Sequence, residues 1–278
     1  MKPSSQPIKL FLALTLSGTS FLGSLTAVLA KPAPLKSGRL LSDRTNSKTV
    51  TAQIASFNLP APPPGPSPGG RSRGGAKRGE CPKVNTELTA LVPFTKKGKE
   101  PDYVTDVWGL TTEENPTWLF YVPYTKASAY TAEFVLQDEQ DNSIYQIVPL
   151  SLPDQPGIIR VSLPANTSRL EVGKRYRWFL TVNCNQNKES LPVYVYVAGV
   201  IQRVNLSQEV AQKLKTATPQ QQVAIYAQNG VWHEALTKLA ELRQQYPQDL
   251  ALQAEWQNLL ASFQFDDVAA EPIVSAKP

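Results

Sequence analysis

A few clustered carboxylates are the side chains of this sequence best suited to catalysis. Glu113 and Glu114 precede a run of aromatic residues, and Asp138, Glu139 and Asp141 fall in a polar turn. Two carboxylates on facing strands are sufficient for glycoside hydrolysis, so these residues define one hypothesis, a carboxylate-based glycan hydrolase. Acidic residues also populate turns because they hydrogen-bond the local backbone, and we favour this second interpretation.

Other catalytic chemistries lack the residues that they need. His233 is the single histidine, its helical neighbours predict an exposed position, and no Gly-x-Ser-x-Gly motif supplies a nucleophile. One histidine and two cysteines are too few ligands for zinc, and the polar turn lacks the spaced ligand loop of a calcium site. The glycines of residues 69–79 do not follow a strand, as those of a phosphate-binding loop would. We therefore predict no catalytic residue, metal or cofactor, and a protein that is not an enzyme.

Aromatic side chains indicate a binding function instead, because their flat apolar faces suit sugar rings. Most aromatic residues of a β-rich protein fill its core, so only some can face solvent. The candidates for a ligand-stacking surface are Trp118, Tyr121, Tyr194 and Tyr196.

The two cysteines, Cys81 and Cys184, are expected to form one disulfide bond. An even cysteine count is typical of disulfides in exported proteins, and two buried thiols are the alternative. The bond would close a loop of about 100 residues, and in the chain-entropy model it would stabilise the fold by about 4–5 kcal/mol.

Residues 1–30 have the three parts of a secretory signal peptide. Two lysines give a positive start, an apolar run covers residues 10–29, and small residues precede a cleavage site after Ala30, with Ala27 as the second choice. The alternative is an uncleaved membrane anchor, but serine, threonine and glycine interrupt the apolar run. We predict cleavage and a secreted or periplasmic protein of the cell envelope, with no membrane span in the mature chain.

Residues 31–79 read as a disordered linker rich in proline, glycine and arginine, with no periodic apolar face. They carry nine Lys or Arg and one acidic residue, whereas residues 80–278 carry 17 basic and 22 acidic residues. The positive charge therefore belongs to the linker, and a nucleic-acid-binding fold is not expected. The basic end of the linker suggests either attraction to an anionic partner or a solvated tether.

Residues 80–204 alternate apolar and polar side chains with a period of two, which predicts short β-strands. A polar cluster at residues 137–143 separates two strands of a hairpin, and residues 171–184 show the clearest alternation. The chain is thus predicted to be mainly β, with an antiparallel β-sandwich of immunoglobulin-like architecture. Val182 stands where a true immunoglobulin domain has a tyrosine, so only the architecture is predicted.

Residues 205–267 change to a period of about 3.6, which predicts a small C-terminal α-helical hairpin region. Thr218 and Pro219 are typical of a helix start, and Gly230 is typical of a helix end. A second helix should end before Pro247, and residues 268–278 should form a disordered tail.

Two resemblances add to this description. The helical pair resembles the second half of a tetratricopeptide repeat at Tyr226, Gly230, Ala235, Leu239, Leu242 and Pro247. The mature chain resembles a cyanobacterial family of secreted proteins known as a domain of unknown function. The matching segments are the Arg/Gly-rich lead into Cys81 and residues 88–93, 115–124, 133–138 and 170–184. The resemblance implies a compartment and a fold, and it brings no activity.

Together these features predict an exported, non-enzymatic binding protein of the cell envelope. Its partner would be an envelope protein bound by the helical region, or an envelope polysaccharide bound by the aromatic residues and the basic linker. The hydrolase hypothesis is the enzymatic alternative. Nucleic acid is not an expected partner, and the sequence does not define an oligomeric state.

Cleavage of the signal peptide is the first testable expectation. N-terminal sequencing of the protein recovered from the cell envelope should read Lys31-Pro32-Ala33, because small residues lead up to Ala30. Recovery of a membrane-bound chain that still carries residues 1–30 would contradict cleavage.

Overall fold

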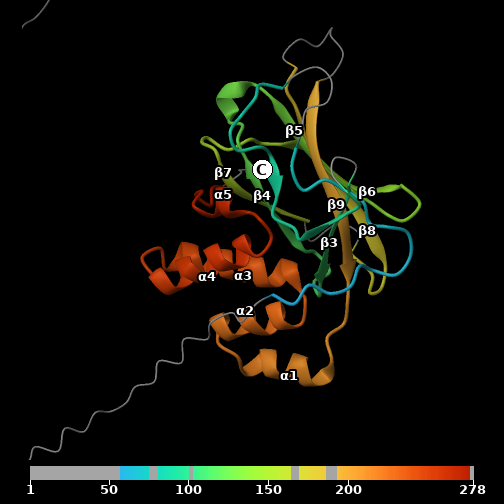
Figure 1. Cartoon of the computed structure of the whole chain (residues 1–278), viewed down its shortest axis with the longest axis vertical. Helices are drawn as coiled ribbons and strands as arrows, with labels where there is room; N and C mark the ends of the chain where they lie inside the picture. Colours follow the sequence, from blue (N-terminus) through green and yellow to red (C-terminus); the bar gives the residue numbers. More distant parts are fainter. Residues whose placement is uncertain (1–56, 75–80, 100–102, 164–168, 186–192, 276–278) are drawn as a thin grey trace, which may run out of the picture. The chain divides into compact units, whose positions relative to one another are not determined.

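The computed structural model describes residues 57–74, 81–99, 103–163, 169–185 and 193–275. It shows a mainly β protein with two sheets, followed by C-terminal helices (Figure 1). The expected signal peptide and its cleavage site at Ala30 lie outside the described residues. Within the described part, no helix has the length and apolar character needed to cross a bilayer.

The larger sheet has six strands, in the order β2-β3-β9-β8-β5-β6. Their bounds are β2 (Phe94–Lys97), β3 (Val104–Thr111), β5 (Thr131–Gln137), β6 (Ser143–Leu150), β8 (Arg175–Asn183) and β9 (Tyr194–Arg203). The predicted hairpin is confirmed as β5 and β6, and the alternation predicted for β8 is also confirmed. The prediction of a wholly antiparallel arrangement is wrong, because β3 and β9 pair in parallel. No hairpin joins these two strands, so no short turn sets their direction.

The smaller sheet has three antiparallel strands, β1 (Thr89–Ala90), β4 (Thr117–Val122) and β7 (Gly157–Ser162), with β4 at the centre. Trp118 and Phe120 of β4 belong to the same apolar core as Trp178 of β8. The edge-to-face contact between Phe120 and Trp178 has a centroid distance of 5.6 Å. Side chains of the two sheets therefore share one core.

Five α-helices follow β9: α1 (Gln208–Thr216), α2 (Pro219–Gln228), α3 (Trp232–Gln245), α4 (Leu250–Ala261) and α5 (Asp266–Ala269). The predicted helix start is confirmed, because Thr218 caps α2 in a capping box with Gln221 and Pro219 occupies the first turn. The predicted end is also confirmed: Gly230 follows α2 with a φ of +72°, a conformation that favours glycine. Helix α3 ends before Pro247, as expected.

Helices α3 and α4 lie next to the smaller sheet (Figure 1), and apolar side chains of α2 to α5 share a core with that sheet. Leu119 and Tyr121, on the β4 face opposite Trp118, share a second core with Trp256 of α4. The indole nitrogen of Trp232 in α3 donates to the carbonyl of Leu91 at 2.7 Å. Strand β4 is thus covered on both faces.

Residues 57–74, which we call the strap, lie first against the helices and then along the sheets, in contrast to the predicted linker. Arg71 exchanges two backbone hydrogen bonds with Ala198 of β9, and the carbonyl of Gly69 accepts from Val107 of β3. Gly70 has a φ of +123°, and a Cβ atom there would lie 2.5 Å from the Ala198 carbonyl. Backbone pairing, which the side-chain pattern does not reveal, places the strap.

Asp106 of β3 also holds the strap, because its buried carboxylate accepts hydrogen bonds from Ser67 and from the Gly69 amide at 2.9 Å. Lys97 forms an ion pair with the same carboxylate. Burial opposes ionisation, but the hydrogen bonds and the charge of Lys97 outweigh it and lower the pKa of Asp106.

The C-terminal segment also differs from the predicted disordered tail. Val268 and Ala269 are buried in the second core. Farther along, Ile158 of β7 donates its amide to Pro272 and accepts from the Val274 amide, both at 2.8 Å. The apolar contacts of α5 and this edge pairing account for the order of residues 268–275.

Cys81 and Cys184 form a disulfide with their Cα atoms 5.4 Å apart. Because the bond spans 103 residues, its reduction should lower the free energy of unfolding by about 3–5 kcal/mol. Urea unfolding with and without a thiol reductant measures this difference, with the Cys81→Ser/Cys184→Ser double variant as the reductant-insensitive control. Equal unfolding midpoints for the oxidised and reduced proteins would contradict the expectation.

Candidate functional site

The four aromatic candidates separate into two buried and two surface residues. Trp118 is 0% exposed and Tyr121 is 4% exposed, each within one of the apolar cores. They do not provide a stacking surface, because protein side chains cover their rings. Tyr194 is 53% exposed on β9, and Tyr196 is half-buried two residues farther along.

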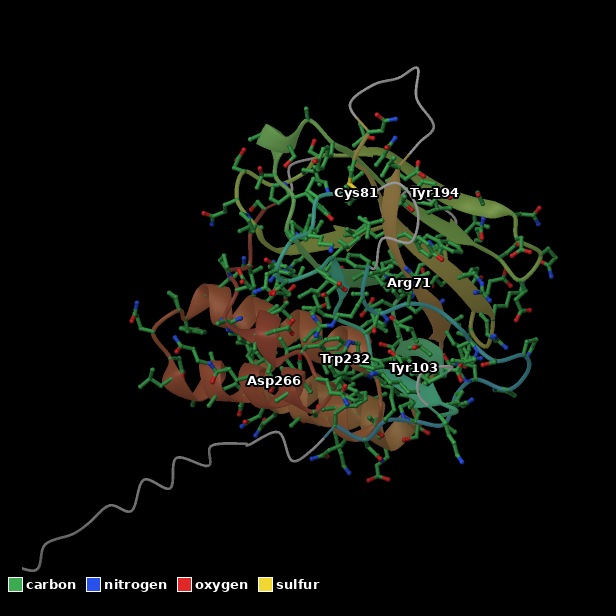
Figure 2. All side chains as sticks on the ribbon, turned by 45° about the horizontal axis from the view of Figure 1, so that its top comes forward. Arg71, Cys81, Tyr103, Tyr194, Trp232 and Asp266 are labelled. Atoms are coloured by element: carbon green, nitrogen blue, oxygen red, sulfur yellow. A yellow bond between two sulfur atoms is a disulfide. The ribbon has the colours of Figure 1, made fainter. Side chains whose placement is uncertain are left out.

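Tyr194 and Tyr196 lie on the outer face of the six-stranded sheet, since their neighbours Val195 and Val197 point into the core. The two ring centroids are 6.5 Å apart, with 53° between the ring planes. The guanidinium of Arg71 lies 5.0 Å from the Tyr196 ring centroid. We call these three residues the tyrosine face; Figure 2 labels Arg71 and Tyr194.

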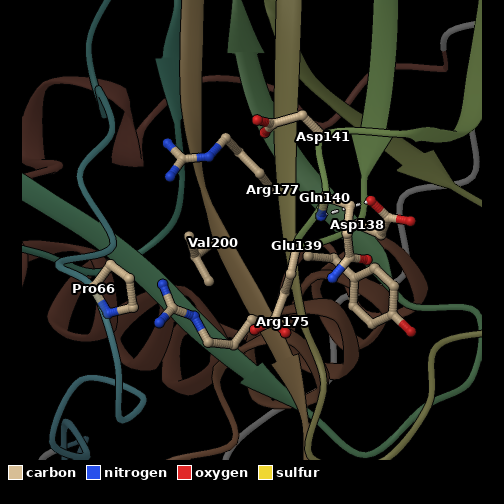
Figure 3. A pocket seen from close by; sticks show the side chains of 9 residues that line it. Pro66, Asp138, Glu139, Gln140, Asp141, Arg175, Arg177 and Val200 are labelled. Carbon is tan, nitrogen blue, oxygen red and sulfur yellow. Dashed lines mark hydrogen bonds between the residues drawn. The ribbon is translucent and has the colours of Figure 1, made fainter.

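A groove of about 400 Å³ lies on the same sheet, between the strap and the β5–β6 turn (Figure 3). Pro66 of the strap forms one side, and Arg175 and Arg177 extend from β8 toward that side. The residues that line the groove are Pro66, Asp138, Glu139, Gln140, Asp141, Arg175, Tyr176, Arg177 and Val200.

The carboxylates proposed for hydrolysis lie on two separate connections. Asp138, Glu139 and Asp141 line the groove, whereas Glu113 and Glu114 belong to the connection between β3 and β4. One oxygen of Asp138 accepts from the amides of Gln140 and Asn142, both at 2.9 Å, and the other accepts from the Asn142 side chain. The Asn142 side chain and these amides lower the pKa of Asp138, the opposite of what a general acid requires.

Glu114 is also engaged, because its carboxylate forms ion pairs with Arg169 at 2.8 Å and Arg203 at 3.3 Å. Arg203 donates further hydrogen bonds to the carbonyls of Thr112 and Leu170. These contacts join the β3–β4 connection to the end of β9 and the segment before β8, which is a structural role.

His233 is buried, and the prediction of an exposed histidine is wrong. Its Nδ1 atom lies 3.1 Å from the carbonyl of Thr117, and its ring contacts Trp118 edge to face. Burial lowers the pKa of His233 to about 4, so the imidazole is neutral at physiological pH. The residue became buried because α3 docks on β4, a tertiary contact that its helical neighbours do not predict.

Glu234 is a buried carboxyl group that the sequence did not single out. One of its oxygens accepts from the Thr111 hydroxyl at 2.5 Å, the Thr112 amide at 3.0 Å and the Glu113 amide at 3.2 Å. Burial raises the pKa of Glu234 against the opposing effect of these hydrogen bonds. The group fixes the start of α3 to the end of β3 and lies apart from the groove.

Arg73, at the basic end of the linker, is engaged within the fold. Arg73 forms two hydrogen bonds with the Asp267 carboxylate, at 2.6 and 2.8 Å, and one with the Gln264 carbonyl. It therefore holds the strap to α5. In the described ranges, no group of three or more His, Cys, Asp or Glu side chains could hold a metal ion.

The fold and this surface define a mainly β protein with two sheets, a C-terminal helical region and a groove lined by charged residues on the same sheet as Tyr194 and Tyr196. The chain belongs to the family described as Domain of Unknown Function (DUF928), whose model matches residues 73–273. The match runs from Arg73 to Ile273, so it includes both sheets and the helices. Arg73 forms a β-bridge with Thr89 of β1, and Ile273 forms one with Ile158 of β7. No curated protein and no solved structure matches the chain.

The buried carboxyl group gives a pH-dependent expectation. A raised native pKa means that wild-type stability falls as pH rises above 4.5, the ordinary value for glutamate. Glu234→Gln keeps an acceptor oxygen and cannot ionise, so its stability relative to wild type should increase from pH 4 to pH 7. Glu234→Ala leaves the three donors without an acceptor and should lose about 1–3 kcal/mol. Thermal unfolding across this pH range tests both; a constant difference between Glu234→Gln and wild type would contradict the assignment.

Proposed function

We propose that this protein is an exported, non-enzymatic binding protein of the cell envelope that holds a polysaccharide on the outer face of its six-stranded sheet. The observation that carries the proposal is Tyr194, a residue that is 53% exposed beside Tyr196 on a regular strand. Flat aromatic rings offer apolar faces to sugars, and a sheet holds them in place. The groove on the same sheet adds hydrogen-bonding groups.

The second candidate, an envelope protein bound by the helical region, has less support. The apolar side chains of α3 and α4 already pack against β4, as Leu236 and Trp256 do with Leu119 and Tyr121. That face is therefore not available to a partner. The hydrolase alternative is also weaker, because the candidate carboxylates lie on two separate connections. The carboxylate of Asp138 also accepts hydrogen bonds from backbone amides of its own turn.

Several finer features belong to the same proposal. We interpret the two sheets with their shared core as a sandwich of immunoglobulin-like architecture. The likeness of α2 and α3 to half of a tetratricopeptide repeat, the cyanobacterial origin and the export signal are supported by the sequence patterns. Export also suits a disulfide between Cys81 and Cys184, since such bonds persist in oxidising compartments.

Substitution of Tyr194 tests the proposal. Tyr194→Ala should weaken binding of the full mature chain to polysaccharide extracted from the envelope by about tenfold, a loss of ~1.4 kcal/mol of binding free energy. Affinity electrophoresis in gels that contain the extract gives the comparison. Tyr246→Ala is the matched control, because Tyr246 is 51% exposed but lies after α3, on the helical region.

The control should bind like wild type. Equal binding by Tyr194→Ala and wild type, or a loss confined to Tyr246→Ala, would contradict the placement of the site on the sheet. Release of reducing sugar from the extract by the wild-type protein would contradict the non-enzymatic role.

A further inference from the structure

The groove beside the tyrosine face presents opposite charges that do not neutralise each other by direct contact. Arg175 and Arg177 come from β8, and Glu139 and Asp141 come from the β5–β6 turn. Across the part of the chain that the structure describes, no ion pair joins either arginine to these carboxylates. Donors and acceptors thus face one groove and remain open to a ligand (Figure 3).

The other charged groups around the groove have partners. Asp138 accepts three hydrogen bonds within its turn. Lys174 and Arg169, which line an adjoining pocket, form ion pairs with Glu171 and Glu114. Arg175 donates once to the Pro64 carbonyl at 3.2 Å, and a guanidinium has further N–H groups to offer. The charged groups left to recognise a ligand are therefore two guanidinium groups and two carboxylates, and the side-chain amide of Gln140 also lines the groove.

Because guanidinium groups and carboxylates both line the groove, it suits a ligand that both donates and accepts hydrogen bonds better than a ligand of a single charge. The arginines would attract an anionic ligand, but the carboxylates of the β5–β6 turn would repel it. The carboxylates would attract a cationic ligand, but the arginines would repel it. Two neighbouring sugar hydroxyls can form hydrogen bonds with both kinds of group, because one donates to a carboxylate and the other accepts from a guanidinium. Hydrogen bonds to charged groups are also the stronger ones.

We propose that the groove is a subsite for the hydroxyl groups of a neutral polysaccharide, continuous with the tyrosine face. This inference rests on the proposed function and names the substrate class of the same site. Val200, in the groove, is four residues from Tyr196 on β9, which corresponds to about 13 Å along the strand. A ligand that contacts both places is therefore a chain of sugars rather than a single one.

Two single substitutions of opposite charge provide the test. Arg177→Gln removes a positive charge that has no ion pair within the described residues. Asp141→Asn removes a negative charge, and the φ of +61° at this position suits asparagine. Lys215→Gln on α1 and Asp266→Asn on α5 are exposed controls that remove the same charges away from the sheet.

Binding of the full mature chain is measured by calorimetry with four neutral polysaccharides (dextran, laminarin, xylan and galactomannan), with anionic polygalacturonate and with cationic chitosan. We expect at least one neutral probe to bind. Arg177→Gln and Asp141→Asn should each weaken that binding by about tenfold, in the same direction, while the two controls bind like wild type.

Other outcomes overturn the inference in distinguishable ways. If Arg177→Gln weakens binding and Asp141→Asn strengthens it, the ligand is anionic, and the reverse pattern makes it cationic. If Tyr194→Ala abolishes binding but neither groove variant changes it, the groove is not a subsite and the proposed function stands. If no probe and no envelope polysaccharide binds, both the inference and the proposed function fail.

Discussion

Burial of strand β4 on both faces is the constraint on which the rest of the structure depends. Trp118 and Phe120 pack toward the six-stranded sheet, whereas Leu119 and Tyr121 pack toward the helices. A strand that is apolar on both faces needs a cover on each side. The helices are therefore an integral layer, and their packing leaves the outer face of the six-stranded sheet as the surface that carries the tyrosine face and the groove.

The segments that flank the sheets in sequence complete this arrangement through their backbones. The strap pairs with β9 at Ala198 and with β1 at Thr89, and Ile273 adds to the edge of β7. The Arg73 side chain also holds the strap to α5. Both edges of the smaller sheet are thus partly covered, which limits unwanted strand pairing. The strap also contributes Pro66 and Arg71 to the candidate site, so a segment with the composition of a linker becomes part of the proposed binding surface.

The sequence correctly predicts the helix ends and turns that are formed by residues close together in the chain. The capped start of α2 at Thr218, its end at Gly230 and the β5–β6 hairpin all follow from side chains close in sequence. Long-range contacts decided the rest. A period of two places Tyr121 and Tyr194 on strands but does not reveal which strand faces are covered, and His233 is buried only because α3 docks on β4. The groove likewise depends on the strap, whose order comes from backbone hydrogen bonds.

The most direct test of the account is side-chain footprinting of Tyr194 and Tyr246, which are exposed to nearly the same extent. Hydroxyl radicals should oxidise both residues in the free protein at similar rates, and mass spectrometry measures each rate. Envelope polysaccharide should protect Tyr194 and leave the oxidation rate of Tyr246 unchanged. Protection of Tyr246 alone, or of neither residue under saturating polysaccharide, would contradict a binding surface on the six-stranded sheet.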